Sequence, residues 1–307
     1  MTARKYVLSA FLAALAALTG LTGCREVDAE QGADAGPPPA DAAPPDATPG
    51  PHPGELWVMA WNIQTFPKAV ATVARVGQML NGMPVDVVGV EEIDDLDAFA
   101  SLDDMLPDYT GLTAEYGDGY SRVGLLYRDA TVHVDGVETL FVGDSNAFPR
   151  PPLAVHVTGQ GVDVTVVVVH LKALGDVTSE ARRKDAVVKL DAWMQARLAA
   201  SPQNRYLVMG DWNDEVTDAA PDNVFQPILD RADLYDVLTL PLAEMPAEST
   251  YIPIPSFIDH MVLTKNALPE WGAGETQVMH FDAQDSQYET IVSDHRPVLT
   301  KFRPAAP

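Results

Sequence analysis

The sequence predicts an α/β protein in which two packed β-sheets lie between outer helices. Many short apolar runs are rich in valine, whereas only three stretches have helical spacing. Continuous apolar runs such as 166–169 are typical of strands that are buried on both faces. Many strands with few helices fit two packed sheets covered from outside. A single domain of about 250 residues accommodates these elements.

Composition excludes several classes of protein. The 307 residues contain 20 Lys+Arg and 44 Asp+Glu, which gives a formal net charge of −24. This balance excludes a generally basic surface that coats nucleic acid, although it allows an enzyme that makes few phosphate contacts. The single cysteine excludes a disulfide scaffold. A hydrophobic content of 47% excludes disorder of the whole chain.

The N-terminal segment has the features of an export signal. Arg4 and Lys5 precede a mostly apolar run over 6–18, and small residues follow it. The run is shorter than the roughly 20 residues of a bilayer-spanning helix. Its last four residues, Leu-Thr-Gly-Cys at 21–24, resemble the lipobox of bacterial lipoproteins. The resemblance implies a signal peptide over 1–23 and a lipid on Cys24; the alternative is an ordinary signal peptide followed by an incidental cysteine.

The segment after Cys24 is expected to be a tether. Residues 24–54 are mostly Ala, Pro, Asp and Gly, a composition with little to bury that favours an extended, semi-rigid linker. Arg25 stands where Asp would imply retention in the inner membrane, so the lipoprotein resemblance favours an exported protein anchored in the outer membrane. The tether holds few of the acidic residues. Most of the negative charge therefore belongs to the domain over 55–307.

The expected elements follow one another from residue 55. Helices are expected over 69–80, 95–105 and 178–199. Strands are expected over 56–61, 85–90, 109–113, 123–127, 132–140, 153–157, 162–169, 206–209, 257–263 and 298–302. No internal repeat interrupts this order.

Polar side chains with metal-binding or acid–base chemistry cluster beside these apolar runs. The set is Asn62, Glu91, Glu92, His170, Asp211, Asn213, Asp259, Asp294 and His295. Their positions indicate one carboxylate-rich rim formed by strand ends. Hard oxygen ligands suit Mg²⁺ or Mn²⁺, with Ca²⁺ as a candidate structural ion, rather than zinc. The histidines are available for acid–base work or for stabilising a phosphate near neutral pH.

Six motifs together resemble the endonuclease/exonuclease/phosphatase superfamily, which includes deoxyribonuclease I. In chain order they are WNIQTF at 61–66, DVVGVEE at 86–92, VHL at 169–171, GDWND at 210–214, FIDH at 257–260 and SDHRP at 293–297. Their order and spacing match that family along residues 56 to 303. The resemblance implies a four-layered α-β-β-α sandwich of mostly antiparallel sheets, with the site at one edge.

The resemblance also implies roles for individual residues. The metal ligands would be Asn62, Glu92 and Asp294, and the catalytic residues His170, Asp211, Asn213, Asp259 and His295. Glu115 is the candidate carboxylate partner of His170, although Ser121 competes for that place. Arg150 resembles an arginine that contacts phosphate. Glu91 stands where the family often has Gln; we expect its charge to face solvent and assign it no ligand role.

These residues suit phosphodiester hydrolysis. A bound divalent cation offsets the negative charge of the phosphate, a carboxylate orients or deprotonates water, and a histidinium stabilises the crowded transition state. The motif at 61–66 favours DNA as the substrate of a monomeric nuclease. Asp94 weakens that preference, because an acid stands where a groove-contacting Arg is usual.

Two other functions remain open at this point. The first is a sphingomyelinase-like lipid phosphodiesterase, for which the segment 251–257 is the nearest equivalent of a membrane-entering hairpin. The second is a non-catalytic binding lipoprotein, against which the intact set of site residues argues.

Overall fold

Two six-stranded sheets form the centre of the computed structural model, which describes residues 52–116, 121–272 and 274–304. The signal peptide over 1–23, Cys24 and most of the tether over 24–54 lie outside the described residues. Within the described ranges, no helix has both the length and the apolar character needed to cross a membrane.

The first sheet has the order β11-β12-β1-β2-β4-β3. Its strands in chain order are β1 (Leu56–Phe66), β2 (Val87–Ile93), β3 (Tyr109–Thr113), β4 (Arg122–Arg128), β11 (Glu275–Val278) and β12 (Val298–Phe302). Strands β1 and β2 run parallel, and every other pairing in this sheet is antiparallel. The sheet is therefore mostly antiparallel, as expected.

The second sheet has the order β5-β6-β7-β8-β10-β9. Its strands are β5 (Val132–Thr139), β6 (Leu153–Gly159), β7 (Val162–His170), β8 (Tyr206–Asp211), β9 (Tyr235–Val237) and β10 (Asp259–Thr264). Only β7 and β8 run parallel. Each sheet thus places one parallel pair near its centre, and the carboxyl ends of a parallel pair share an edge.

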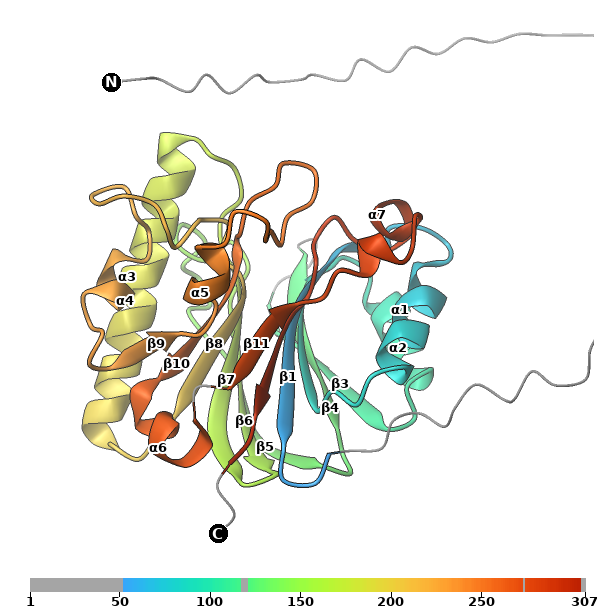
Figure 1. Ribbon diagram of the computed structural model, residues 1–307, viewed down its shortest axis with the longest axis horizontal. Helices are drawn as coiled ribbons and strands as arrows, with labels where there is room; N and C mark the ends of the chain where they lie inside the picture. Colours follow the sequence, from blue (N-terminus) through green and yellow to red (C-terminus); the bar gives the residue numbers. More distant parts are fainter. Residues whose placement is uncertain (1–51, 117–120, 273, 305–307) are drawn as a thin grey trace, which may run out of the picture. The chain divides into compact units, whose positions relative to one another are not determined.

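Helices cover the outer face of both sheets (Figure 1). The first sheet is covered by α1 (Thr72–Asn81), α2 (Leu96–Asp104) and α7 (Tyr288–Ile291). The second is covered by α3 (Val177–Ala200), together with the short helices α4 (Gln226–Leu229) and α5 (Leu240–Ala243). The short helix α6 (Leu268–Trp271) instead packs against the central cluster between the sheets. Two 3₁₀ turns, η1 (Lys265–Ala267) and η2 (Phe281–Ala283), complete the described elements.

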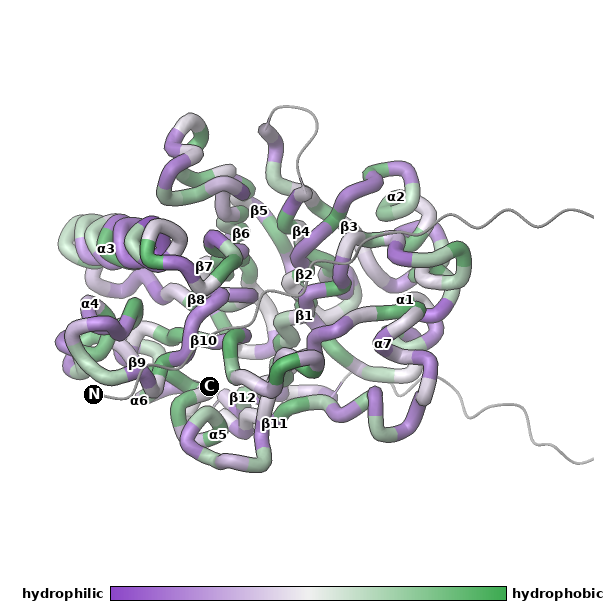
Figure 2. The backbone as a smooth tube through the Cα atoms, turned by 90° about the horizontal axis from the view of Figure 1, so that it is seen from above, coloured by the Kyte–Doolittle hydropathy of each residue, from purple (hydrophilic) through white to green (hydrophobic). Residues whose placement is uncertain are grey.

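Three apolar clusters separate the four layers. The central cluster joins inward-facing residues of both sheets, such as Val58, Val87 and Val168. A second cluster packs the outer face of the second sheet against α3 through residues such as Leu190, and a third packs the first sheet against α1 and α2. Figure 2 shows the layers in sequence from α3 through β8 and β1 to α1. The expected α-β-β-α sandwich is confirmed.

The expected elements match the structure at most positions. The three long helices and ten of the strands lie at or within a few residues of their expected ranges. Strands β9 and β11 and the short helices α4 to α7 were not expected. These elements have only three or four residues each, too few to show an apolar period in the sequence.

His260 on β10 is a buried histidine without a role in the expected chemistry. Its Nδ1 lies 3.0 Å from Thr239 Oγ1 and its Nε2 lies 3.2 Å from the backbone oxygen of Asp214. Burial lowers the pKa of His260 to about 4 and outweighs the opposing effect of the Asp259 charge. The neutral ring therefore joins β10 to two loops of the second sheet.

This neutral histidine predicts a pH-dependent loss of stability. Because the folded pKa lies below the unfolded one, the contribution is complete above about pH 6.5 and is lost as the pH falls towards 4. Chemical denaturation at pH 7 and at pH 4 should show the wild type losing about 3 kcal/mol more than His260→Gln. Equal losses in the two proteins would contradict a neutral buried ring.

Candidate active site

The predicted site residues meet at one edge of the paired sheets. Asn62 on β1 lies opposite Glu91 on β2, and His170 at the end of β7 lies opposite Asp211 at the end of β8. The antiparallel strand β10 begins at the same edge, where Asp259 lies opposite Asp211. The strand directions therefore bring residues that are almost 200 positions apart into one site.

Tight backbone turns aim several of these side chains. Gln64, Thr65, Glu92 and Asn213 have φ values of 36°, 44°, 65° and 55°, in the left-handed region that is uncommon for residues other than glycine. The Thr65 N–H donates to Glu92 Oε2 at 2.8 Å, and the Asn213 N–H donates to Asp211 Oδ1 at 2.8 Å. Such strained turns are characteristic of functional sites, where surrounding contacts hold them.

Asn62 connects the two sheets beneath the site. Its fully buried amide Nδ2 donates to Glu92 Oε1 at 3.1 Å and to Asp211 Oδ2 at 3.0 Å. Its Oδ1 accepts the backbone N–H of Gln64 at 3.0 Å. The amide nitrogen, rather than the oxygen, thus faces the carboxylates, and Asn62 fixes the separation of Glu92 and Asp211.

Asp259 and His295 form a buried ion pair. His295 Nδ1 lies 2.9 Å from Asp259 Oδ2, and both side chains are almost completely buried. Burial opposes the charge on His295, but the Asp259 carboxylate outweighs it with help from Asp211 and Asp294, and the pKa of His295 is raised to about 10. Its Nε2 lies 3.9 Å from both Asp211 Oδ2 and Asp294 Oδ1. The structure therefore places a histidinium N–H among the remaining carboxylates.

Asp211 lies at the centre of the site. Burial raises its pKa to about 7, and the Asp259 charge acts in the same direction against the charge of His295. A carboxylate whose pKa lies near neutral pH can accept a proton from water during hydrolysis. The hydrogen bonds from Asn62 and from the backbone of Asn213 fix its orientation.

His170 faces Asp211 from the neighbouring strand. Its Nε2 lies 3.5 Å from Asp211 Oδ2 and 3.9 Å from Glu92 Oε1. Burial lowers the pKa of His170 well below its usual value, and the charges of Arg150 and His295 act in the same direction. The two site histidines consequently differ in charge, with His170 neutral and His295 positive.

Glu91 corrects one expectation, because its charge does not face solvent. The side chain is fully buried between the sheets, and neither carboxyl oxygen has a hydrogen-bond partner among the described residues. Burial raises the pKa of Glu91 well above its usual value, and Asp259 and Asp211 add to the rise. Residue 91 shares the inward face of β2 with residues 87 and 89, so strand alternation could have predicted its burial.

The Glu91 carboxyl fits because Gly210 has no side chain. A Cβ on Gly210 would lie 2.7 Å from Glu91 Oε1 and 2.1 Å from the backbone oxygen of Val169. The φ of Gly210 is +132°, which other residues rarely adopt. The glycine of the GDWND motif therefore provides the space in which Glu91 lies beneath the site.

The oxygen donors of the site fit a divalent cation. Burial raises the pKa of Asp294, and the Glu92 charge adds to the rise while His295 and Lys68 oppose it. Asp294 Oδ1 is buried without a hydrogen-bond partner, and Gln64 Nε2 donates to its Oδ2 at 2.7 Å. Two neighbouring carboxylates repel each other when both are ionised, and a cation between them relieves this repulsion. Glu92 and Asp294 are the residues best suited to hold it.

A second group also has metal-like spacing. Ligand atoms of Asp211, Asp259 and His295 all lie within 4.8 Å of one another. A metal-binding histidine must be neutral, however, and His295 is held in its charged form by Asp259. We therefore assign these three residues to proton transfer and phosphate stabilisation, and assign metal binding to Glu92 and Asp294.

The two remaining candidates differ in their relation to His170. Glu115 is exposed, and the described residues show no contact between it and His170; His170 Nδ1 has no hydrogen-bond partner in the described part of the chain. The structure thus does not bring together the proposed Glu115–His170 pair. Arg150 donates from Nη1 to the backbone oxygen of Leu171 at 3.2 Å, directly beside His170. That position suits contact with a phosphate.

Three residues of the site were not singled out from the sequence. Gln64 holds Asp294, Tyr251 packs 5.1 Å from the ring of His295, and Tyr288 donates to the backbone oxygen of His295 at 2.6 Å. Gln64 lies within the WNIQTF motif, which is a signal that could have identified it. The two tyrosines have no such signal, because they reach His295 only through the fold.

Three solved structures with a similar fold are distant from this chain in sequence. Truncated Caenorhabditis elegans TDP2 is 15% identical, with a TM-score of 0.62 over 81% of this chain and 97% of its own. D. rerio TDP2 complexed with single strand DNA product is 18% identical, with a TM-score of 0.63 over 81% and 98%. The Bacteroides thetaiotaomicron mannosyl-6-phosphatase is 14% identical, with a TM-score of 0.59 over 80% and 99%. These likenesses support the fold.

Sequence comparison identifies the family. No curated protein sequence matches the chain. The model of the Endonuclease/Exonuclease/phosphatase family matches residues 59–295, which contain every residue of the site described above. The chain therefore belongs to the endonuclease/exonuclease/phosphatase family of phosphodiesterase and phosphatase hydrolases.

Proposed function

We propose that the chain is a divalent-metal-dependent nuclease that hydrolyses phosphodiester bonds of DNA. The observation that carries the proposal is the buried site in which Asp211, with a pKa near 7, lies beside the charged His295 and the neutral His170. Asp211 can act as the base, His295 supplies positive charge, and the neutral His170 can donate or accept a hydrogen bond. The D. rerio TDP2 structure with single strand DNA product supports nucleic acid as the substrate class.

The proposed hydrolysis uses a water molecule in line with the leaving oxygen. Asp211 orients this water and accepts its proton as the new P–O bond forms, and Asn213 helps to position the reacting groups. The His295 Nε2–H stabilises the negative charge on the pentavalent phosphorus, while Asp259 keeps that ring charged. His170 hydrogen-bonds to a phosphate oxygen.

Glu92 and Asp294 would hold Mg²⁺ or Mn²⁺ beside the reacting phosphate. Such an ion would supply positive charge that offsets the phosphate and stabilises the leaving oxygen. Asn62 would keep Glu92 in position through its amide.

A lipid phosphodiesterase is the second candidate. The loop between Tyr251 and Ser256 begins beside His295, and Ile254 in this loop is 70% exposed. Against this candidate, β1 runs from Leu56 to the site, so the chain enters the folded unit at the end opposite the site. A tether that begins there favours a site directed away from the anchoring membrane.

We also propose that Cys24 carries a lipid that anchors the exported protein in the outer membrane, with the site in a monomeric domain. The lipobox-like residues at 21–24 support this proposal. The tether allows the domain to reach substrates in the surrounding space.

Turnover of a substrate panel tests the proposed chemistry. The purified full-length chain should cleave plasmid DNA with Mg²⁺ or Mn²⁺, cleave sphingomyelin and sugar phosphates far more slowly, and lose activity with EDTA because the phosphate charge is no longer offset. Cleavage of sphingomyelin alone would support the second candidate. Absence of cleavage of DNA, RNA and sphingomyelin would contradict the phosphodiesterase assignment.

Substitution of the base and of the charged histidine tests the mechanism. Asp211→Asn and His295→Gln should each lower kcat on DNA by about 10²- to 10⁴-fold, because each removes a proton-transfer or charge-stabilising group. Asp233→Asn is the matched control, since this exposed carboxylate precedes β9 at the opposite end of the second sheet. Near-normal rates in both site variants would contradict the proposed mechanism.

Fractionation of cells tests the anchor. Full-length protein should sediment with outer membranes, and Cys24→Ser should release it to the soluble fraction because the lipid has no attachment point. Thr19→Ser, within the same segment, should leave the distribution unchanged. Membrane association of the Cys24→Ser protein would show that lipid attachment is not the anchor.

A further inference from the structure

Four cations grouped around Arg150 have no carboxylate partner among the described residues, although the chain has a net charge of −24. They are Arg122, Arg150, Lys172 and Arg182, which we call the cation rim. Most other described lysines and arginines form ion pairs with described carboxylates, as Arg183 does with Asp214 at 2.7 Å. In so acidic a protein, a group of cations without partners is a departure from the surrounding pattern.

Three members of the cation rim lie close enough to influence one another, and Arg122 acts together with Arg150 on the pKa of Tyr116. Burial lowers the pKa of Lys172, and the charges of Arg182 and Arg150 lower it further. Arg150 is bound to the backbone beside His170, and Arg182 donates to the backbone oxygens of Asn146 and Ser145 at 2.6 and 2.8 Å. These carbonyl contacts hold the guanidinium groups without neutralising them. An anion at this rim would relieve their mutual repulsion.

A pocket of about 420 Å³ adjoins the cation rim. We call it the rim pocket; Tyr116, Val142, Phe148, Pro149 and Pro151 line it together with Arg182. Its size lies within the range of small-molecule sites, about 300–1,000 Å³. Aromatic and proline rings supply flat apolar walls, and the two prolines flank Arg150 in the chain. An apolar group bound here would lie next to an anion on the cation rim.

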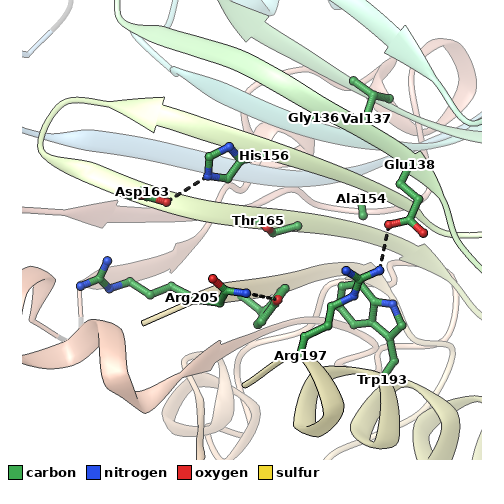
Figure 3. A pocket seen from close by; sticks show the side chains of 12 residues that line it. Gly136, Val137, Glu138, Ala154, His156, Asp163, Thr165, Trp193, Arg197 and Arg205 are labelled. Atoms are coloured by element: carbon green, nitrogen blue, oxygen red, sulfur yellow. Dashed lines mark hydrogen bonds and ion pairs between the residues drawn. The ribbon is translucent and has the colours of Figure 1, made fainter. Parts of the chain in front are cut away.

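Another pocket of about 350 Å³ shows a different charge arrangement. It lies over β5, β6 and β7 beside α3, and none of the site residues lines it (Figure 3). There Arg197 pairs with Glu138 at 3.0 Å, and His156 lies 3.0 Å from Asp163. Arg205 likewise pairs with Glu270. Because each cation already has a carboxylate, this pocket offers no comparable attraction to a phosphate.

We propose that the cation rim and the rim pocket bind the nucleotide that adjoins the scissile phosphodiester, with its phosphate on Arg150, Lys172 and Arg182 and its unstacked base in the pocket. This inference rests on the proposed nuclease function and specifies single-stranded nucleic acid as its preferred substrate. A base in the interior of a duplex is stacked and paired and cannot enter a side pocket without being extruded.

Acidic groups near the cation rim weaken its attraction for a phosphate. The charge of Asp94 raises the pKa of Tyr116, and the charge of Asp176 raises the pKa of Lys172. Asp176 is the N-cap of α3 and accepts the backbone N–H groups of Thr178 and Ser179, so its charge is already engaged. Asp94 is exposed, and its charge reaches Tyr116, which lines the pocket. The strand should therefore leave the site across Lys172 and Arg182 rather than across Asp94.

A paired substitution tests the subsite. Lys172→Gln/Arg182→Gln removes two cations from the rim, and Lys265→Gln/Lys301→Gln removes two cations from the opposite strand ends as a matched control. The first substrate is a single-stranded oligodeoxynucleotide of about 12 nucleotides. The second is bis(p-nitrophenyl) phosphate, which has a scissile diester but no neighbouring nucleotide. Binding of the oligonucleotide in EDTA, measured by fluorescence anisotropy, gives a readout that needs neither metal nor turnover.

The rim variant should lose at least about tenfold more kcat/KM on the oligonucleotide than on the small diester. Its oligonucleotide affinity in EDTA should fall, and the slope of log Kd against log salt should decrease by about 0.7 for each phosphate contact removed. The control variant should match the wild type in all three measurements. Wild-type enzyme should cleave the single strand faster than the same sequence in a duplex.

Val142→Glu provides a second test that leaves the rim cations in place. Val142 is 60% exposed, so the substitution should fold, and its carboxylate in the pocket should weaken oligonucleotide binding. Equal losses on both substrates, or unchanged oligonucleotide affinity in both the rim and pocket variants, would overturn the subsite while leaving the nuclease intact. Failure of the wild type to cleave either substrate would instead overturn the proposed function itself.

Discussion

The buried pair of Asp259 and His295 is the interaction on which the rest of the site depends. Glu91, Glu92, Asp211, Asp259 and Asp294 meet at one sheet edge, and a buried charge without a partner is costly. The His295 charge lowers the cost of ionising Asp211 and Asp294. It is itself retained in a buried place only because Asp259 holds it at 2.9 Å. Removal of either partner would therefore change the charge of the whole edge, not of one residue.

The fold around this pair could be predicted largely from the sequence, because it follows from local patterns. Apolar runs revealed the long strands, and polar residues after them revealed the edge at which the site lies. The turn geometry could not be predicted: the left-handed conformations of Glu92 and Asn213 depend on hydrogen bonds that form only in the folded chain. The positions of Tyr251 and Tyr288 in the site could not be predicted for the same reason, since no local pattern relates either residue to His295.

The distribution of charge shows most clearly why the binding properties of the site could not be predicted from composition. A net charge of −24 describes the chain as a whole and indicated only weak attraction to a polyanion. Ion pairing is decided by the fold, however. Among the described residues, Arg150 and Lys172 beside His170 have no carboxylate partner, whereas Arg197 and Arg205 are paired. The field that a bound phosphate experiences comes mainly from nearby charges, because distant ones are screened within about 8 Å at physiological ionic strength.

Glu91 illustrates how packing and charge act together at this edge. An ionised carboxylate in its place would add a fourth negative charge to those of Glu92, Asp211 and Asp259, without a hydrogen-bond donor to stabilise it. A neutral carboxyl avoids this repulsion and still fills the space that Gly210 leaves between the sheets. Burial thus limits the negative charge of the site, because it favours the neutral form of Glu91. The carboxylates that have a partner, through the amide of Asn62 or the histidinium of His295, are Glu92, Asp211 and Asp259.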